Sequence, residues 1–540
     1  MVRTLSSALA LVLAVAPSLG AQEKVDLETV HKIRQEAFER SKVMEHIFYL
    51  TDVSGPRLTG TPEYLNAANW AVKRLADMGV TEAKLEKWGP FGRGWSYSKF
   101  SAHMVEPNYM PLIGFPLAWC EPTNGPVKGD VVQATIRLEP DFEKYKGKLR
   151  GKIVFVDAKK DLSPQDKPSM QRWTDAELIE RAMDPAALPA AARNQTPSGP
   201  MPGIAPGQPF DMAKVREFVN KRNQFFKDEG VLAVVTMGTR NDGGTMFATS
   251  GGNNDPKRTT PPPMMVIAAE QYNRVVRLTE AGIPVKLEVD LAAKFHNGED
   301  YTYNVIGEIP GTAKRDEVVM IGAHLDSWHG ATGATDNAAG SAIMLEVMRI
   351  LKALDLKMDR TVRIGLWSGE EQGLLGSRAY VKEHFADPEK MDLKTEHAKL
   401  AGYYNIDNGT GKIRGIYLQG NTMLRPVFEA LLAPFKDLGA TTVSIRTTGG
   451  TDHLAFDAVG LPGFQFIQDP IEYQTRTHHS NMDVYDRIVP EDMKQMSAIV
   501  ASFVYHTATR EEKLARKPLP KPGERRAPDG RPAPAKPSAD

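Results

Sequence analysis

Histidines and carboxylates follow several predicted strands between residues 303 and 509, at the point where each strand ends. In the stretch 318–340, VVMIGAHLDSWHGATGATDNAAG, His324 and Asp326 directly follow an apolar run, and Asp336 precedes a helix-like pattern. Further groups of the same kind follow the other strands: Glu370, Glu371, Asp407, His478 and His479. Ligands bind open α/β sheets at the carboxyl ends of the strands, so we expect these side chains to meet at one edge.

Imidazole and carboxylate groups together are ligands that zinc and similar divalent metals take from proteins. Two histidines and three carboxylates are too many for one four-coordinate zinc, and they suit two metals that share a carboxylate. The adjacent Glu370 and Glu371 can then divide the work, one binding metal and the other acting as general base. Asp326 can accept the second ring N–H of His324 and thereby fix the tautomer of that histidine.

Each of these residues also has an ordinary structural interpretation. Asp336 could be a helix N-cap, and Glu370 and Glu371 could be first-turn helix charges. Asp407 could belong to a turn, and the late histidines could lie on the surface. Chance placement of all of them at one sheet edge is a poor explanation, which favours the metal site. The sequence has neither G-x-S-x-G nor H-E-x-x-H, the signatures of two other hydrolase classes.

The elements that must position these groups are predicted by hydrophobic periodicity. Residues 303–509 alternate between strands and helices, which indicates a mostly parallel sheet covered on both faces. Residues 28–80 are helical, with an amphipathic helix at 61–79, and residues 81–88 alternate as a strand does.

Residues 116–290 have a different character, with short strands and one helix at 212–230. Within them, the segment 160–210 is rich in Pro, Ala, Met and Gln and is predicted to be a long, loosely structured insertion. The lone Cys120 excludes an intrachain disulfide and is expected to pack as a small hydrophobe.

The two ends of the chain have the composition of targeting and tail segments. Arg3, an apolar run and small residues at 18–21 form a signal-peptide pattern, and the run is shorter than a membrane span. We therefore predict a signal peptide at 1–21, no membrane span after its removal, and export to the periplasm or the extracellular space. Residues 511–540 are predicted to be a disordered, Pro-rich tail. Lysine plus arginine and aspartate plus glutamate are equal at 67 each, which gives no electrostatic case for nucleic acid.

Five motifs in a fixed order resemble the M28 family of zinc exopeptidases: HLDS, ATDNAAG, SGEEQGLLGS, NIDNG and HHSNMD. The stretch YLTDVSGPRLTGTPEYLNAA is more specifically similar to the carboxypeptidase Q-like branch, whose members carry an inserted protease-associated (PA) domain. The resemblance implies a mixed, mostly parallel sheet sandwiched by helices, with a β-rich PA-like insertion. It divides the chain into an N-terminal part of the peptidase domain at 22–115, the insertion at 116–295 and the metallopeptidase core at 296–510.

The same resemblance implies a role for each motif residue. His324 and Asp407 would hold one zinc ion, Glu371 and His479 the other, and Asp336 would bridge them. Glu370 would be the general base and acid. His479 is preferred to His478 because the last ligand of the family directly precedes Ser or Thr. In the family the peptide after the bridging aspartate, here Asp336–Asn337, is often cis.

Further residues are candidates for substrate contact. The stretch GGTDHLAFDAVG, 449–460, matches a family segment near the substrate pocket, so Asp452 and His453 are candidates, with a turn and helix cap as the alternative. Tyr473 is a candidate for oxyanion stabilisation.

The predicted function is that of an exported two-zinc exopeptidase that acts on short peptides. Aminopeptidase or dipeptidase specificity is favoured, and carboxypeptidase-type specificity stays open. A glutaminyl cyclase-like enzyme with one zinc is disfavoured by the PA-like insertion, and a non-catalytic relative by the complete ligand set. A homodimer is a further expectation from the resemblance.

Overall fold

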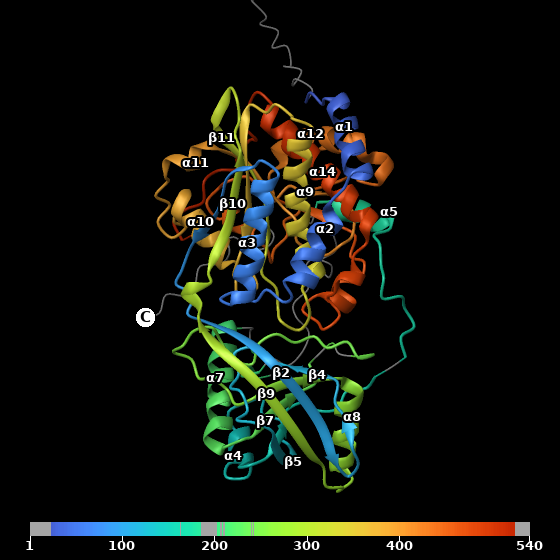
Figure 1. The fold of residues 1–540 in the computed structure, drawn as a ribbon, viewed down its shortest axis with the longest axis vertical. Helices are drawn as coiled ribbons and strands as arrows, with labels where there is room; N and C mark the ends of the chain where they lie inside the picture. The colour runs from blue at the N-terminus through green and yellow to red at the C-terminus, as the bar shows by residue number, and fades with distance from the viewer. Residues whose placement is uncertain are drawn as a thin grey trace, which may run out of the picture.

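A computed structural model describes residues 23–523, apart from 163, 185–201, 206–207, 209–210, 239 and 241. The predicted signal peptide, residues 1–21, and residues 524–540 of the predicted tail lie outside the described residues. The chain forms two bodies, each built on an eight-stranded sheet, which are the upper and lower bodies of Figure 1. None of the described helices combines the length and apolar character that a membrane span requires.

The upper body contains a mixed sheet whose four central strands are parallel to one another. Its strands lie in the order β1 (Thr81–Lys87), β10 (Tyr303–Ile309), β12 (Arg360–Trp367), β11 (Lys314–His324), β13 (Leu400–Asn405), β16 (Gly463–Gln468), β14 (Ile413–Tyr417) and β15 (Thr442–Ser444). The pairs β1–β10, β10–β12 and β14–β16 are antiparallel. The predicted mixed, mostly parallel sheet is therefore confirmed.

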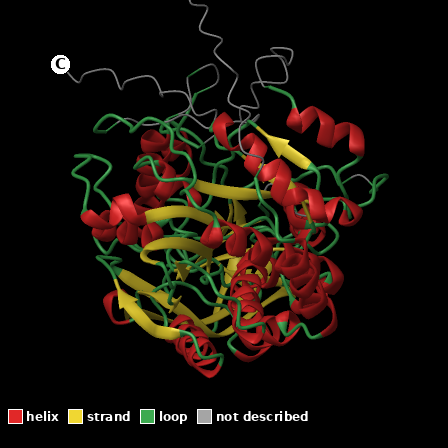
Figure 2. Ribbon diagram, turned by 90° about the horizontal axis from the view of Figure 1, so that it is seen from above, coloured by secondary structure: helices red, strands yellow, loops and turns green. Residues whose placement is uncertain are grey.

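Helices cover both faces of this sheet, as Figure 2 shows from above. Along β11, Val319 and Ile321 belong to one apolar cluster, whereas Val318 and Met320 belong to another on the opposite face. The first cluster includes residues of α1 (Leu27–Glu39), α2 (Val43–Phe48), α3 (Pro62–Asp77), α9 (Ala339–Ala353), α12 (Arg425–Leu432) and α14 (Pro490–Thr509). The second includes residues of α10 (Leu375–His384) and α13 (His453–Asp457), and the short α11 (Thr395–Lys399) precedes β13. Burial on both faces explains the continuous apolar run 318–323 of the central strand β11.

The lower body contains the second sheet and begins earlier in the chain than predicted. Its strands lie in the order β3 (Met110–Pro111), β2 (Arg93–Glu106), β9 (Lys286–Asn297), β5 (Val127–Gln133), β6 (Ile153–Phe155), β7 (Ala233–Thr236), β8 (Met264–Ile267) and β4 (Gly114–Pro116). Its helices are α4 (Asp141–Tyr145), α7 (Met212–Glu229) and α8 (Ala269–Glu280). The long strand β2 pairs with β9 from Arg93 to Glu106, so the body starts near residue 93 and not at the predicted boundary of 116. Cys120 is buried here, as expected, and the kinship with a PA domain stays a prediction.

The predicted loose segment 160–210 contains an ordered strap, residues 169–182, that contacts the upper body, so the prediction is wrong for these residues. Helix α5 (Asp175–Ala182) begins with a capping box between Thr174 and Glu177. Leu178 is buried in a small cluster with Tyr417 and Ile467 of the upper body. The capping box was the available sequence signal, and the surrounding Pro and Ala residues obscured it.

The predicted disordered tail is likewise ordered up to residue 523. Leu514 is buried in the main apolar cluster of the upper body. The Arg516 guanidinium donates hydrogen bonds to the carbonyl oxygens of His397 and Leu400, at 2.9 and 2.7 Å. One apolar residue and several main-chain contacts therefore hold a segment whose composition alone predicted disorder.

Replacing Leu514 by alanine should lower the free energy of unfolding by about 2–5 kcal/mol, because truncation of a buried leucine loses apolar contacts and leaves a cavity. Leu514 is 2% exposed, whereas Leu519 is 52% exposed, so Leu519→Ala is a matched control. The control should change the free energy of unfolding by less than about 0.5 kcal/mol. Urea denaturation of both variants provides the measurement, and equal effects would contradict the packed tail.

Candidate metal centre

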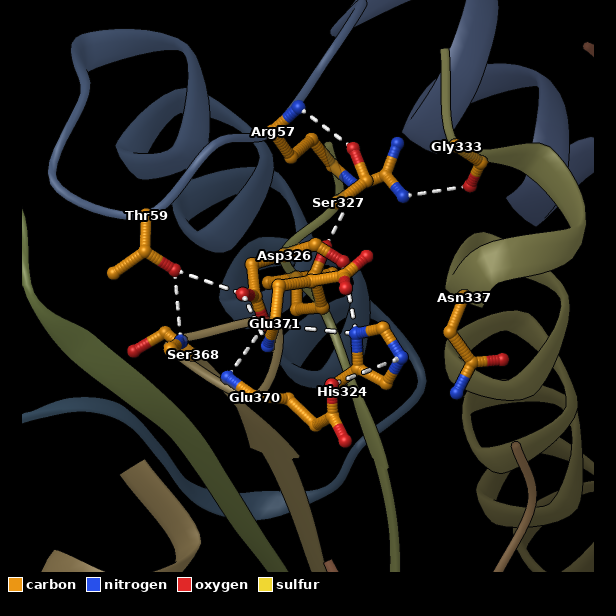
Figure 3. A network of polar contacts seen from close by, with 12 residues as sticks. Arg57, Thr59, His324, Asp326, Ser327, Gly333, Asn337, Ser368, Glu370 and Glu371 are labelled. Atoms are coloured by element: carbon orange, nitrogen blue, oxygen red, sulfur yellow. Dashed lines mark hydrogen bonds and ion pairs between the residues drawn. The ribbon is translucent and has the colours of Figure 1, made fainter. Parts of the chain in front are cut away.

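The central parallel strands bring the predicted site residues to one edge of the upper sheet. His324 is the last residue of β11, Glu370 and Glu371 follow β12, and Asp407 follows β13. The segment that carries His479 follows β16. Figure 3 shows His324 beside the turn that contains Glu370 and Glu371. Because the strands are parallel, their carboxyl ends share this edge, as the sequence analysis predicted.

Asp336 lies between two groups of candidate ligands. His324 Nε2 is 3.2 Å from Asp336 Oδ1 and 3.4 Å from Asp407 Oδ1. His479 Nε2 is 3.2 Å from Asp336 Oδ2 and 2.9 Å from Glu371 Oε2. One carboxylate oxygen of Asp336 therefore points to each group, which is the arrangement of a bridging ligand. The predicted cis peptide Asp336–Asn337 is also present.

The two late histidines differ in what they reach. His478 Nε2 lies 3.8 Å from Asp336 Oδ2, and the His478 ring stacks on His479 with 3.8 Å between ring centroids. His479 contacts both Asp336 and Glu371 at shorter distances. The geometry thus favours His479 as the ligand, and this assignment stays a prediction.

Hydrogen bonding fixes the tautomer of His324, although not as predicted. His324 Nδ1 is 2.9 Å from the main-chain carbonyl oxygen of Asp326, and a carbonyl oxygen only accepts, so Nδ1 carries the proton. The Nε2 lone pair is then free for a metal. The Asp326 carboxylate is farther from Nδ1, at 3.5 Å, so the prediction that this carboxylate is the main acceptor is corrected.

The Asp326 carboxylate instead holds the turn after β12. It accepts the backbone N–H groups of Glu370 at 3.3 Å and Glu371 at 3.4 Å. It also accepts the Thr59 hydroxyl at 3.0 Å, while Thr59 Oγ1 accepts the N–H of Gly369 at 2.7 Å. Asp326 and Thr59 therefore set the direction in which the two adjacent glutamates leave the turn, as the dashed contacts of Figure 3 trace.

The donor set fits a divalent cation. Among the buried side-chain atoms of the described residues that have no hydrogen-bond partner are His324 Nε2, Asp336 Oδ2 and Glu371 Oε1. Buried polar atoms are normally satisfied, and imidazole and carboxylate lone pairs that converge in this way suit zinc. His324, Asp336 and Asp407 have ligand atoms close enough together to hold one ion, and so do Asp336, His478 and His479.

Burial controls the protonation of the carboxylates. It raises the pKa of Glu370 well above its usual value, and the nearby Asp407 and Asp452 carboxylates add to the effect. Burial and Asp336 raise the pKa of Glu371 to about 7. Burial also disfavours ionised Asp336, but the adjacent His324 and His479 side chains outweigh it and lower the pKa of Asp336 well below its usual value. Of these three carboxylates, Asp336 is the one that its surroundings hold as an anion.

Two residues that sequence reasoning did not single out hold the loops around the site. The Asp483 carboxylate accepts the backbone N–H groups of Thr335 at 2.6 Å and Asp336 at 3.1 Å. Arg57 is fully buried and donates to the carbonyl oxygens of Leu50, Leu325, Thr332 and Gly333 at 2.6 to 2.9 Å. Figure 3 shows the contact with Gly333. Burial lowers the pKa of Arg57 to about 10. Both residues lie inside motifs that the resemblance had already marked, HHSNMD and SGPRLTG, which was the available signal.

A cleft of about 640 Å³ opens over the site. Its lining includes the candidate ligands Asp336, Glu371, Asp407 and His479, together with Glu370, Tyr473, Arg378, Gly449, Gly450, Thr451 and Leu454. Asp452 and His453 are fully buried and are not among the lining residues, whereas their neighbours Thr451 and Leu454 are. The prediction that Asp452 and His453 contact substrate is therefore not supported, because the start of α13 directs them inward.

Comparisons with known proteins agree with this geometry. Residues 304–504 match the family model for Peptidase family M28. Carboxypeptidase Q of Rattus norvegicus is 30% identical over 247 residues, which are 46% of this chain and 50% of that protein. Aminopeptidase YwaD of Bacillus subtilis is 30% identical over 217 residues, which are 39% of this chain and 46% of that protein. The chain thus spans about half the length of the curated relatives it matches.

Solved structures show the same fold along nearly the whole chain. A Peptidase M28 precursor from Shewanella amazonensis superposes with a TM-score of 0.63 at 24% identity, covering 92% of this chain and 98% of that one. BSAP, a zinc aminopeptidase from Bacillus subtilis, superposes with a TM-score of 0.53 at 19% identity, covering 88% and 96%. At these identities the likeness concerns the fold.

Asp326→Asn should lower the affinity for zinc about 10–100-fold, because an amide offers one acceptor oxygen where two are used. At least one backbone N–H of the turn that contains Glu370 and Glu371 then loses its acceptor, and the side chain of Glu371 moves from its position. Thr59→Ser keeps the hydroxyl and should bind zinc as the wild type does. Competition with a chromophoric chelator measures both affinities, and an unchanged affinity in Asp326→Asn would refute this role.

Proposed function

Since residues 304–504 match the family model for Peptidase family M28, we propose that the chain is a zinc-dependent exopeptidase that hydrolyses the peptide bonds of short peptides. The observation that carries this proposal is the position of Asp336, with one oxygen toward His324 and the other toward His479. The relatives that support it have aminopeptidase and carboxypeptidase in their names. The N-terminal pattern supports export of the enzyme.

The ligand assignment follows the two groups around Asp336. His324 and Asp407 would hold one zinc ion, Glu371 and His479 the other, and Asp336 both. Bound zinc would polarise the carbonyl of the scissile bond and make a water molecule more acidic. Two groups of ligands that share the Asp336 carboxylate favour a pair of zinc ions. A pair of ions in turn favours a peptidase over a glutaminyl cyclase-like enzyme with one zinc.

Glu370 is the group that moves the proton. Its carboxylate lines the cleft, and its pKa is raised by burial, so it can accept a proton from the attacking water. It then returns the proton to the leaving amine. Tyr473 also lines the cleft, and burial raises the pKa of its hydroxyl well above the usual value. Tyr473 therefore stays protonated and can donate a hydrogen bond to the developing oxyanion.

A second candidate specificity rests on Arg378. Arg378 is an exposed residue of α10 and is the only lysine or arginine among the described residues that line the cleft. Glu370, Glu371 and Asp407 line the same cleft and would attract the cationic groups of a substrate. A permanent cation in the same cleft suits a free carboxylate of the substrate. This observation favours dipeptides or carboxypeptidase-type cleavage over an aminopeptidase that ignores the carboxyl end.

Glu370→Gln should abolish turnover while zinc stays bound, because glutamine keeps the shape but cannot accept a proton. The expected loss in kcat is about 10²–10⁴-fold. Glu371→Gln is the matched control, since it should first weaken zinc binding and make activity depend on added zinc. Bound zinc and kcat are measured for both variants, with two zinc ions per chain expected in the wild type. If Glu370→Gln loses zinc and Glu371→Gln retains it, the roles are reversed.

Arg378→Met should lower kcat/KM for a dipeptide about tenfold and leave that for the corresponding dipeptide amide unchanged, because only the dipeptide offers a carboxylate. A tenfold change corresponds to about 1.4 kcal/mol. Arg378→Lys keeps the charge and should retain part of the preference. The assay compares both substrates across the three proteins. Equal use of both substrates by the wild type would favour aminopeptidase specificity.

A further inference from the structure

One ligand-bearing segment differs from the others in how it is held. His324, Glu371 and Asp407 lie at or just beyond the ends of central strands, whereas His479 lies on a longer connection after β16. We call residues 469–483 the histidine loop. His479 adopts a positive φ of 61° on this loop, a conformation that side-chain-bearing residues hold only when their surroundings impose it.

The lower body contacts the main chain of this loop at both histidines. The Arg240 guanidinium donates to the carbonyl oxygens of Gln474 at 3.1 Å and His478 at 3.4 Å. The backbone N–H of Ala248 donates to the carbonyl oxygen of His479 at 3.2 Å. The carbonyl groups of both histidines are therefore bonded to residues of the lower body.

Asn481 adds a side-chain link between the same two segments. Its Oδ1 accepts the backbone N–H of Met246 at 2.7 Å, and its Nδ2 donates to the carbonyl oxygen of Gly244 at 3.1 Å. The backbone N–H of Asn481 donates to the carbonyl oxygen of Met246 at 3.3 Å. Three hydrogen bonds thus join this one residue to the segment 244–246.

The strap holds the other end of the histidine loop through its main chain. Gln171 and Ile471 exchange both backbone hydrogen bonds, at 2.9 and 2.8 Å, as a short antiparallel bridge. The Thr475 hydroxyl donates to the carbonyl oxygen of Ser169 at 2.8 Å. In Figure 1 the strap and α5 leave the lower body and lie against the upper one.

Charged contacts anchor this part of the strap. Arg172 Nη1 donates to the carboxylates of Asp469 at 2.9 Å and Asp492 at 2.7 Å. The Asp469 carboxylate is fully buried and also accepts the backbone N–H of Trp173 at 3.0 Å. The first residue of the histidine loop is therefore tied to the strap by a buried, charge-assisted pair.

The ligands of the other group have partners in the upper body. The Nδ1 of His324 donates to the carbonyl oxygen of Asp326 at 2.9 Å. The carbonyl oxygen of His324 accepts the Ser341 hydroxyl at 2.8 Å. The carbonyl oxygen of Asp407 accepts Gln465 Nε2 at 2.9 Å. Residues of the lower body thus bond directly to the main chain of His478 and His479, whereas these contacts of His324 and Asp407 lie within the upper body.

We infer that the lower body positions the histidine loop, so that Arg240 and Asn481 are positioning residues for the metal that Glu371 and His479 hold. The inference rests on the metal assignment of the proposed function. It gives the lower body a part in assembling the site, because the short helical element of the loop, η7 (Tyr473–Thr477), ends before His479. Loss of its partners should weaken one of the two zinc sites selectively.

The experiment measures the two stepwise zinc affinities of the full chain by competition with chromophoric chelators. Arg240→Ala removes an exposed guanidinium, and Asn481→Ala removes the side-chain link. Arg274→Ala is the matched control, since the hydrogen bonds of Arg274 to Met110 and Asn108 lie within the lower body. We expect one affinity to fall about 10–100-fold in the first two variants, and the other to stay within about twofold. The control should bind both ions as the wild type does.

Three outcomes would overturn the inference, and they are distinguishable. Two unchanged affinities in Arg240→Ala and Asn481→Ala would show that the histidine loop needs no support from the lower body. Equal weakening of both sites would indicate a general structural effect without selectivity for the Glu371 and His479 site. At most one zinc ion in the wild type would refute the metal pair itself, and the proposed function with it.

Discussion

The burial of several carboxylates beside two imidazoles at one sheet edge is the constraint on which the structure depends. Asp336, Glu371 and Asp407 lie within reach of His324 and His479, and their side chains are only 3–7% exposed at the base of the cleft. Buried charges are costly unless they are paired, hydrogen-bonded or bound to a metal. The raised pKa values of Glu370 and Glu371 express that cost, and the lowered pKa of Asp336 shows where the histidines offset it.

The rest of the upper body keeps these groups in place. Parallel pairing of β11 with β12 and β13 aligns the strand ends, and apolar helices on both faces fix the sheet. Between the strand ends and the ligands, hydrogen bonds to buried side chains hold the loops in place. Arg57 donates to four carbonyl oxygens, the Asp483 carboxylate accepts the N–H of Asp336, and the Asp326 carboxylate accepts the N–H groups of the turn that contains Glu370. Each of them satisfies backbone groups that a buried loop would otherwise leave unpaired.

The sequence predicted what depends on local pattern and chain order. Strand ends and ligand types were readable because apolar periodicity and residue chemistry are local properties, and the motif order supplied the rest. Contacts set by tertiary packing were not readable: the Asp326 carbonyl in place of its carboxylate, the inward direction of Asp452, the ordered Leu514 and the strap. The Asp326 carboxylate is engaged by the distant Thr59 and Glu370, and Leu514 and the strap pack on residues far away in the chain, so composition gave no hint of these contacts.

The connection between the two bodies explains how the lower body can reach the site. The lower body is inserted between β1 and β10, whose adjoining ends Lys87 and Tyr303 are paired neighbours, so the insertion leaves and returns at one point of the upper sheet. The chain then continues as the paired strands β2 and β9, starting at Arg93 and Asn297. A body that is attached by a single pair of strands can bend about the point where that pair joins the rest of the chain. The strap and the segment 244–248 contact the upper body at the histidine loop, which follows β16. These contacts lie far from the β1–β10 pair, both along the chain and in the order of strands in the upper sheet. Attachments at two places restrict this bending, and the second of them coincides with the loop that carries a metal ligand.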